Sequence, residues 1–165
     1  MYARIASVLL CCIVCIALGV PVHAEAPSAK PKLDRSGQAK KGRASYYDAR
    51  KFGGRKMANG ERLNPQSNAA ASRTLPLGTK ARVTNLQNGR SAEVEIKDRG
   101  PYVAGRTVDV TPKVAEDLDI KKEGVAPVVV APIQVPQPDG SVKLGDGAKP
   151  DASASIGSSS PEHEH

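Results

Sequence analysis

The stretch Ala81–Asp98, ARVTNLQNGRSAEVEIKD, decides the fold class of this chain. Apolar and polar residues alternate on both sides of Asn88-Gly89, and such alternation is typical of strands with one buried face. Asn-Gly between two alternating runs is the strongest short-range signal for a β-hairpin. We therefore predict two antiparallel strands joined at this dipeptide.

Further strands are predicted downstream of the hairpin, in RTVDVT (106–111) and VAPVVVAPIQV (125–135). Upstream, residues 48–68 are rich in Gly, Asn and charged residues, which predicts loops. The chain has one Phe and no Trp, so its core must be made of Val, Leu, Ile and Ala. Side chains of this size suit a small closed β-barrel better than an open sandwich.

One short helix is expected in TPKVAEDLDI (111–120). Thr111 suits the N-cap and Pro112 suits the first helical position. Val114 and Leu118 lie one turn apart and would face the core together. The sequence thus predicts a mainly β domain with one or two short helices.

Composition predicts one folding unit, residues 43–135, between two flexible segments. Residues 25–42 are rich in Lys, Pro and Ala, which predicts a disordered basic linker. Residues 136–165 are rich in Gly, Ser, Asp and Pro, which predicts a disordered tail.

Residues 1–24 have the pattern of a signal peptide. Arg4 precedes an apolar run from Ile5 to Val20, and Val-His-Ala predicts cleavage after Ala24. The alternative is a membrane anchor, but the apolar run is short for a span. We therefore expect export to the periplasm or cell envelope, with no membrane span left in the mature chain.

All three cysteines, Cys11, Cys12 and Cys15, lie in this leader. None has the preceding small residues of a lipid-attachment site, so no lipid anchor is expected. A mature chain without cysteine has neither a disulfide nor a thiolate nucleophile.

The formal net charge is +7, and the stretch 137–165 is acidic, so the positive charge concentrates before it. A basic exported domain is attracted to polyanions such as cell-wall polymers or anionic lipid. No nucleic-acid partner is expected, because the chain has neither a recognition-helix pattern nor a series of stacking aromatics. The alternative, of equal weight, is that the charge serves only solubility.

Asp98 stands where the second hairpin strand meets the turn DRGP (98–101). In a regular strand Asp98 has the parity of Val94 and Ile96, which would point its carboxylate inward at the mouth of the barrel. The alternative is a turn-forming role, because Asp often binds the backbone amides that follow it. Local sequence favours the turn, and Asp109 in RTVDVT leaves the same two interpretations open.

Three segments together resemble the RlpA (rare lipoprotein A) family of bacterial envelope proteins. They are GRASYYDARKFGGRKMANGERLN (42–64), AAASRTLPLGTKARVTNLQNGRSAEVEIKDRGPY (69–102) and GRTVDVTPKVAEDL (105–118). The resemblance covers residues 42–135 and implies a six-stranded double-psi β-barrel. It also implies lytic transglycosylase activity on peptidoglycan glycan strands, with a preference for strands that lack stem peptides. We expect a monomer.

The implied reaction breaks the β-1,4 bond from N-acetylmuramic acid to N-acetylglucosamine without water. One group protonates the leaving oxygen and then takes the proton of the muramic acid 6-hydroxyl, which closes a 1,6-anhydro ring. One carboxylate can therefore suffice, whereas ordinary glycosidases use two. No metal or other cofactor is expected.

The resemblance also implies site residues. Asp98 would be the general acid and base, and Glu61 of ANGE would be a second catalytic carboxylate in the groove. The implied substrate-binding residues are Asn59, Ser72, Arg99 and Tyr102.

Ser72 departs from the family pattern, which usually has a histidine there, and the only histidines are His23, His163 and His165. This keeps open a non-catalytic, expansin-like protein that binds and loosens peptidoglycan. Such a protein would have few aromatic rings for stacking on sugars, namely Tyr46, Tyr47 and Tyr102.

A hydrolase that pairs Asp98 with Glu61 or Asp109 is the third alternative, and it would leave reducing ends instead of anhydro ends. The carboxy-terminal peptidoglycan-binding module of many family members is not expected in residues 136–165, which are polar and low in apolar residues.

Overall fold

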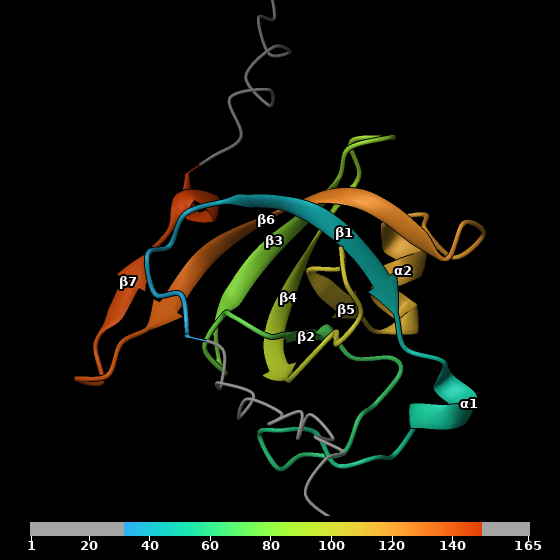
Figure 1. Cartoon of the computed structure of the whole chain (residues 1–165), viewed down its shortest axis with the longest axis horizontal. Helices are drawn as coiled ribbons and strands as arrows, with labels where there is room; N and C mark the ends of the chain where they lie inside the picture. Colours follow the sequence, from blue (N-terminus) through green and yellow to red (C-terminus); the bar gives the residue numbers. More distant parts are fainter. Residues whose placement is uncertain (1–31, 150–165) are drawn as a thin grey trace, which may run out of the picture. The chain divides into compact units, whose positions relative to one another are not determined.

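Six strands close into a barrel in the computed structural model, which describes residues 32–149 (Figure 1). The strands are β1 (Lys40–Tyr46), β2 (Ala69–Ser72), β3 (Lys80–Asn85), β4 (Ser91–Asp98), β5 (Val108–Val110) and β6 (Val125–Pro136). They follow the order β1-β5-β2-β4-β3-β6, and β6 pairs back onto β1. The pairs β1–β5 and β2–β4 are parallel and the others are antiparallel. The predicted mainly β barrel is confirmed.

The predicted hairpin is present as β3 and β4, which pair antiparallel from Lys80↔Glu95 to Thr84↔Ser91. Gly89 has a φ of 72° in the connecting turn, a conformation that glycine adopts without steric cost. The predicted strand 125–135 is β6, and only the centre of 106–111 is strand, as β5.

The core consists of small aliphatic side chains, as the composition predicts. Its fully buried members from the strands are Ala44, Ala70, Ala81, Val83, Ile96, Val108, Val110, Ala126 and Val128. Helix α2 (Pro112–Asp117) lies at one end of the barrel (Figure 1) and contributes Val114 and Ala115 to the same core. Leu118, directly after it, is also fully buried.

Thr111 precedes α2 as predicted, but its hydroxyl does not cap the helix. Instead the hydroxyl donates to the carbonyl oxygen of Ser67 at 2.5 Å. The other end of the helix is tied to the hairpin, because the amide groups of Asn85 and Asn88 both donate to the carbonyl of Leu118, at 3.0 and 3.2 Å.

The predicted linker 25–42 is too long at its carboxy-terminal end. β1 begins at Lys40 and pairs with β6 from that residue onward. Before it, the amide of Asp34 donates to the carbonyl of Thr74 at 2.7 Å. The polar residues at the start of β1 lie on the outer face of the strand. Their low apolar content therefore reflects exposure to solvent and not disorder.

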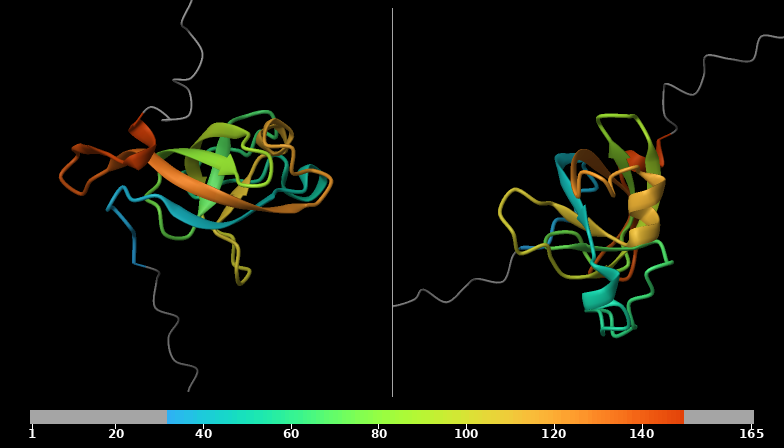
Figure 2. Two further views of the ribbon diagram at one scale, coloured as in Figure 1. Left: turned by 90° about the horizontal axis from the view of Figure 1, so that it is seen from above. Right: turned by 90° about the vertical axis from the view of Figure 1, so that its right-hand side faces the viewer.

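The predicted disordered tail begins too early. β6 includes Pro136, β7 (Val142–Leu144) pairs with β6, and the 3-10 helix η1 (Asp146–Ala148) follows (Figures 1 and 2). A Cβ at Gly145 or Gly147 would lie 2.3 or 2.4 Å from a carbonyl oxygen of β6. The glycine content of this segment suggested flexibility. In the structure, Gly145 and Gly147 instead allow the chain to pack closely against β6.

Residues 1–31 and 150–165 lie outside the described part of the chain, and so do the predicted signal peptide and the end of the predicted tail. Among residues 32–149, no helix is long and apolar enough to cross a membrane.

Gly42 is a site of close approach in β1. A Cβ there would lie 1.8 Å from Oγ1 and 2.7 Å from Cβ of Thr107. We expect Gly42→Ala to lower the free energy of unfolding by about 1–3 kcal/mol, the usual cost of overpacking. Urea unfolding measures this, with the exposed neighbour substitution Lys41→Ala as control. Equal stability of Gly42→Ala and the control would contradict the close contact.

Candidate active site

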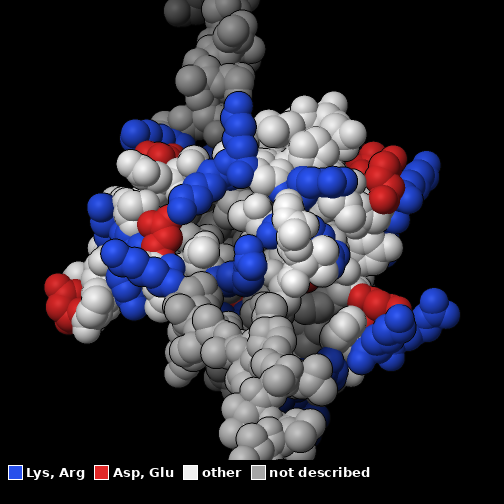
Figure 3. Space-filling model, in the orientation of Figure 1, with Lys and Arg blue, Asp and Glu red and all other residues white. Residues whose placement is uncertain are grey.

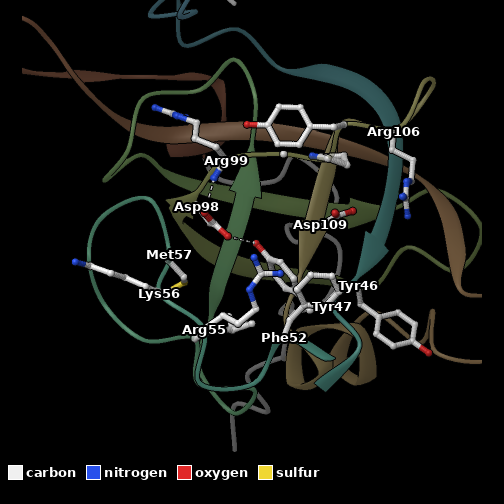
Figure 4. A pocket seen from close by; sticks show the side chains of 14 residues that line it. Tyr46, Tyr47, Phe52, Arg55, Lys56, Met57, Asp98, Arg99, Arg106 and Asp109 are labelled. Atoms are coloured by element: carbon white, nitrogen blue, oxygen red, sulfur yellow. Dashed lines mark hydrogen bonds between the residues drawn. The ribbon is translucent and has the colours of Figure 1, made fainter. Parts of the chain in front are cut away.

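A groove of about 410 Å³ opens beside the ends of β1, β4 and β5 (Figure 4). Most of its lining residues come from the connection between β1 and β2, residues 47–68, and from the 99–107 connection. The 99–107 connection projects from the barrel (Figure 2). The lining residues are Tyr46, Tyr47, Phe52, Arg55, Lys56, Met57, Leu63, Asp98, Arg99, Gly100, Pro101, Tyr102, Arg106 and Asp109.

Asp98 reaches the groove through a β-bulge. Between β2 and β4 the register runs from Ala70↔Ile96 to Ala71↔Asp98, which leaves Lys97 as an extra residue. Because register partners point to the same face of a sheet, Asp98 shares the face of Ala71 and not that of Ile96. The expectation that Asp98 keeps the parity of Ile96 is wrong, because the strand is not regular at this point.

The bulge completes a row of side chains across four adjacent strands. Ala71 on β2 pairs with Asp98 on β4 and with Asp109 on β5, and Asp109 pairs with Ser45 on β1. All four residues therefore lie on the face opposite the barrel core. The backbone of each residue is held by strand pairing, so the two carboxylates stand on a rigid support.

The carboxylate of Asp98 is held by three hydrogen bonds. Oδ1 accepts from the backbone amides of Ala58, at 2.9 Å, and Arg99, at 2.8 Å, and Oδ2 accepts from the hydroxyl of Tyr47 at 3.3 Å (Figure 4). The bond from Arg99 is the turn-forming contact that local sequence favours. The same side chain also lines the groove, so the two interpretations of Asp98 are compatible.

Tyr47 is placed by strand pairing and by a small second core. Its amide donates to the carbonyl of Val110 at 3.0 Å. Its ring packs with Phe52 at 6.1 Å between centroids, and both rings contact a cluster of Met57, Leu63 and Ala69. This cluster fixes the wall of the groove against the sheet.

The pKa of the Tyr47 hydroxyl is raised, first by burial and then by the negative charges of Asp98 and Asp109. Tyr47 therefore keeps its proton throughout the neutral range and stays a hydrogen-bond donor to Asp98.

The raised pKa of Tyr47 predicts a stability effect at high pH. Above about pH 10 an unfolded tyrosine loses its proton while the folded Tyr47 keeps it, so rising pH favours unfolding. We expect the stability advantage of the wild type over Tyr47→Phe to shrink above this pH, by up to about 1.4 kcal/mol per pH unit. Urea unfolding of both proteins from pH 8 to 11 measures it, and parallel curves would contradict the burial of the hydroxyl.

Asp109 is held by a different set of partners. The hydroxyl of Ser45, a buried residue, donates to Oδ1 of Asp109, and Nη1 of Arg106 donates to the same hydroxyl oxygen at 2.7 Å. Figure 4 shows both Asp98 and Asp109 at this groove. The groove thus contains two carboxylates.

Arg99 and Tyr102 both line the groove. The guanidinium of Arg99 donates to the carbonyls of Ser72 and Leu75, at 3.0 and 2.6 Å, and this braces the turn after Asp98. The side chain of Tyr102 is 77% exposed at the rim. An exposed ring at a groove rim is a suitable surface for stacking on a sugar.

Glu61 does not line the groove, contrary to the expectation. Its side chain is 59% exposed and forms an ion pair with Nζ of Lys97 at 2.9 Å. The hydrogen bond from Lys97 is the main cause that lowers the pKa of Glu61. Asn59 is also outside the lining, because its Oδ1 accepts from the amide of Glu61 at 3.0 Å and forms the loop turn.

Ser72 is buried and also lies outside the groove lining. Its hydroxyl oxygen accepts from the amides of Thr74 and Leu75, at 3.4 and 3.2 Å. The side chain therefore shapes the turn after β2, and only its carbonyl approaches the site, through Arg99.

Sequence reasoning missed several groove residues, among them Phe52, Arg55, Met57 and Arg106. Phe52 is the last residue of the short helix α1 (Ala49–Phe52), which lies in a segment predicted to be loops. The other three residues come from loops, which have no periodic sequence pattern. One signal was available: Tyr46 ends β1 and Tyr47 follows it directly, and neighbouring side chains of an extended chain point to opposite sides.

Lys and Arg side chains gather over much of the face shown in Figure 3. This agrees with the positive net charge and with attraction to an anionic polymer. Within residues 32–149, no group of three or more His, Cys, Asp or Glu side chains could hold a metal ion.

Known proteins match the barrel region. A family model described as lytic transglycolase (DPBB_1) matches residues 39–130, more than half of the chain. "Probable endolytic peptidoglycan transglycosylase RlpA" of Nostoc sp. is 50% identical over 88 residues, 53% of this chain and 24% of that protein. "Endolytic peptidoglycan transglycosylase RlpA" of Pasteurella multocida is 43% identical over 102 residues, 62% of this chain and 34% of that protein.

The chain thus matches only a quarter to a third of the length of these two relatives. Among solved structures, the expansin of Clavibacter michiganensis is similar with a TM-score of 0.45 and 18% identity. That match covers 60% of this chain and 52% of the expansin.

Proposed function

The chain belongs to the lytic transglycolase family, and from this premise we propose that it is an endolytic peptidoglycan transglycosylase with Asp98 as general acid and base. The observation that carries the proposal is the carboxylate of Asp98, which three hydrogen bonds hold at an open groove. A general acid must be fixed within reach of the substrate oxygen, and this arrangement provides that fixation.

In the proposed reaction, Asp98 gives its proton to the oxygen that leaves with N-acetylglucosamine as the bond to C1 of N-acetylmuramic acid breaks. The 6-hydroxyl oxygen of the muramic acid then bonds to C1, and Asp98 takes the hydroxyl proton. Asp98 is thereby returned to its acid form, and no water is consumed. The products are a 1,6-anhydro end and a new N-acetylglucosamine end.

The neighbours of Asp98 support this cycle by keeping the carboxyl group in one orientation. Two backbone amides hold Oδ1, so Oδ2 is the atom that exchanges the proton, with the Tyr47 hydroxyl beside it. Arg99 braces the turn, and Tyr102 at the rim contacts the sugar chain. We assign no substrate contact to Glu61, Asn59 or Ser72, since none of them lines the groove.

We further propose that the partner is the peptidoglycan glycan strand and that the protein works in the cell envelope. The basic surface supports this, because it attracts an anionic wall polymer.

The proposal is tested by incubating the mature chain with purified sacculi and examining the soluble fragments by mass spectrometry. We expect fragments with 1,6-anhydro-muramic acid ends that accumulate with time. Soluble fragments with only reducing ends would instead identify a hydrolase.

A second candidate is a non-catalytic wall-binding protein, which is favoured by one observation. The described residues contain no histidine, and Ser72 at the usual histidine position is buried in a turn. This candidate predicts salt-sensitive binding to sacculi with no anhydro ends released, and binding unchanged in Asp98→Asn.

A further inference from the structure

Asp109 is a groove carboxylate that the one-carboxylate cycle leaves without a role. We propose that Asp109 is a second catalytic carboxylate, which contacts the muramic acid ring and stabilises the positive charge that develops at C1. This inference rests on the proposed function, and it gives Asp109 the place that the resemblance implied for Glu61.

The position of Asp109 follows from the sheet register. Asp98 and Asp109 are the partners of Ala71 from its two sides, so they lie two strands apart at the same level of the sheet. Two strand spacings separate their Cα atoms by about 10 Å. Ala71 between them has only a methyl group, which leaves the space between the two carboxylates unfilled by the middle strand.

This spacing suits chemistry on one sugar ring. In glycosidases, two carboxyl groups about 5–9.5 Å apart flank the bond that is cleaved. Two Asp side chains that start about 10 Å apart on one face reach this range as they extend into a common groove. Both line the groove, and the Tyr47 hydroxyl feels the charge of both.

The fold does not need a carboxylate at position 109. β5 is paired on both sides, with β1 and β2, so Asp109 forms no turn and no helix cap. Among residues 32–149, the hydrogen-bond partner of its side chain is the hydroxyl of Ser45, and an asparagine oxygen would accept that bond equally well. We therefore infer that the negative charge of Asp109 acts on a substrate in the groove. Ser45 and Arg106 keep the side chain in place there.

Glu61, by contrast, is in no position to take this role. Its carboxylate is committed to Lys97 and exposed to solvent outside the groove lining. Screening by water weakens any field that it could exert on a buried ring.

The step that we assign to Asp109 involves no proton transfer. As the bond from C1 to the leaving oxygen breaks, the electron pair stays with that oxygen, which takes the proton of Asp98. The ring oxygen and C1 then share a positive charge opposite the Asp109 carboxylate. The charge disappears when the 6-hydroxyl oxygen bonds to C1 and its proton passes to Asp98.

The test compares Asp109→Asn with the wild type on peptide-free glycan strands, with the rate of anhydro-end formation as readout. We expect kcat to fall by about 10²–10³-fold, the usual effect of removing a group that stabilises transition-state charge. KM and the thermal midpoint should stay close to wild type, because Asn keeps the bond from Ser45. Asp117→Asn on the exposed side of α2 is the matched control, expected within threefold of wild type.

A second measurement keeps the test decisive if Asp109→Asn folds poorly. The carboxyl ¹³C resonance of Asp109 in the wild type is followed during titration with peptide-free glycan fragments, and contact with the sugar predicts a saturable shift. No shift, or a folded Asp109→Asn with kcat within threefold of wild type, would overturn the proposal for Asp109 alone. A wild type that forms no anhydro ends would overturn the proposed function and, with it, this role.

Discussion

Asp98→Asn is expected to lower the rate of anhydro-end formation by about 10²–10⁴-fold, the range that general acid–base catalysis contributes. Asparagine has nearly the shape of aspartate, and its amide oxygen can still accept from the backbone amides of Ala58 and Arg99. It cannot give a proton to the leaving oxygen or take one from the 6-hydroxyl. The initial rate on peptide-free glycan strands, followed by mass spectrometry, measures the effect.

Two controls give this result its meaning. Asp117→Asn makes the same chemical change on an exposed residue and should leave the rate within threefold of wild type. Binding of Asp98→Asn to sacculi should persist, because the rest of the groove is unchanged. If Asp98→Asn retained more than a tenth of the wild-type rate, the acid–base role would have to pass to another residue.

Ile96→Ala is expected to lower the free energy of unfolding by about 2–5 kcal/mol, because it leaves a cavity in a packed core. Ile96 has one of the largest fully buried side chains of the described residues. A small domain has only about 5–15 kcal/mol of stability in total, so this is a large fraction. Urea unfolding followed by circular dichroism gives the difference.

The matched control is Leu86→Ala in the hairpin turn, where the side chain is 50% exposed. It should change stability by no more than about 0.5 kcal/mol. If Ile96→Ala cost less than about 1 kcal/mol, the closed and tightly packed barrel described above would be contradicted.

The parts of the fold that could be predicted from sequence are those with a local pattern. The hairpin, β6 and α2 have alternation or helical spacing together with turn or cap residues. β2 has no such pattern, because all four of its residues, Ala69–Ser72, are buried and neither face is polar. β7 was hidden by the Gly-rich and polar composition around it.

In the candidate site, too, only features with a local sequence pattern could be predicted. Asp98 could be proposed as a candidate from the sequence, but the direction of its side chain depends on the bulge at Lys97. A one-residue register shift is not visible in the alternation of β4. The resemblance implies site roles for Glu61, Asn59 and Ser72, yet their side chains lie outside the groove lining, in loop and turn contacts. The sequence could not decide between a structural and a catalytic role for Asp109, because it does not show which strands are neighbours.

The most direct test of the central claim is to incubate the protein with peptide-free glycan strands in H₂¹⁸O and to weigh the products. A transglycosylase closes the ring with the sugar's own 6-hydroxyl, so we predict anhydro ends that contain no ¹⁸O, and their loss in Asp98→Asn. Products whose new muramic acid ends are reducing and contain ¹⁸O, or no cleavage at all, would contradict the account.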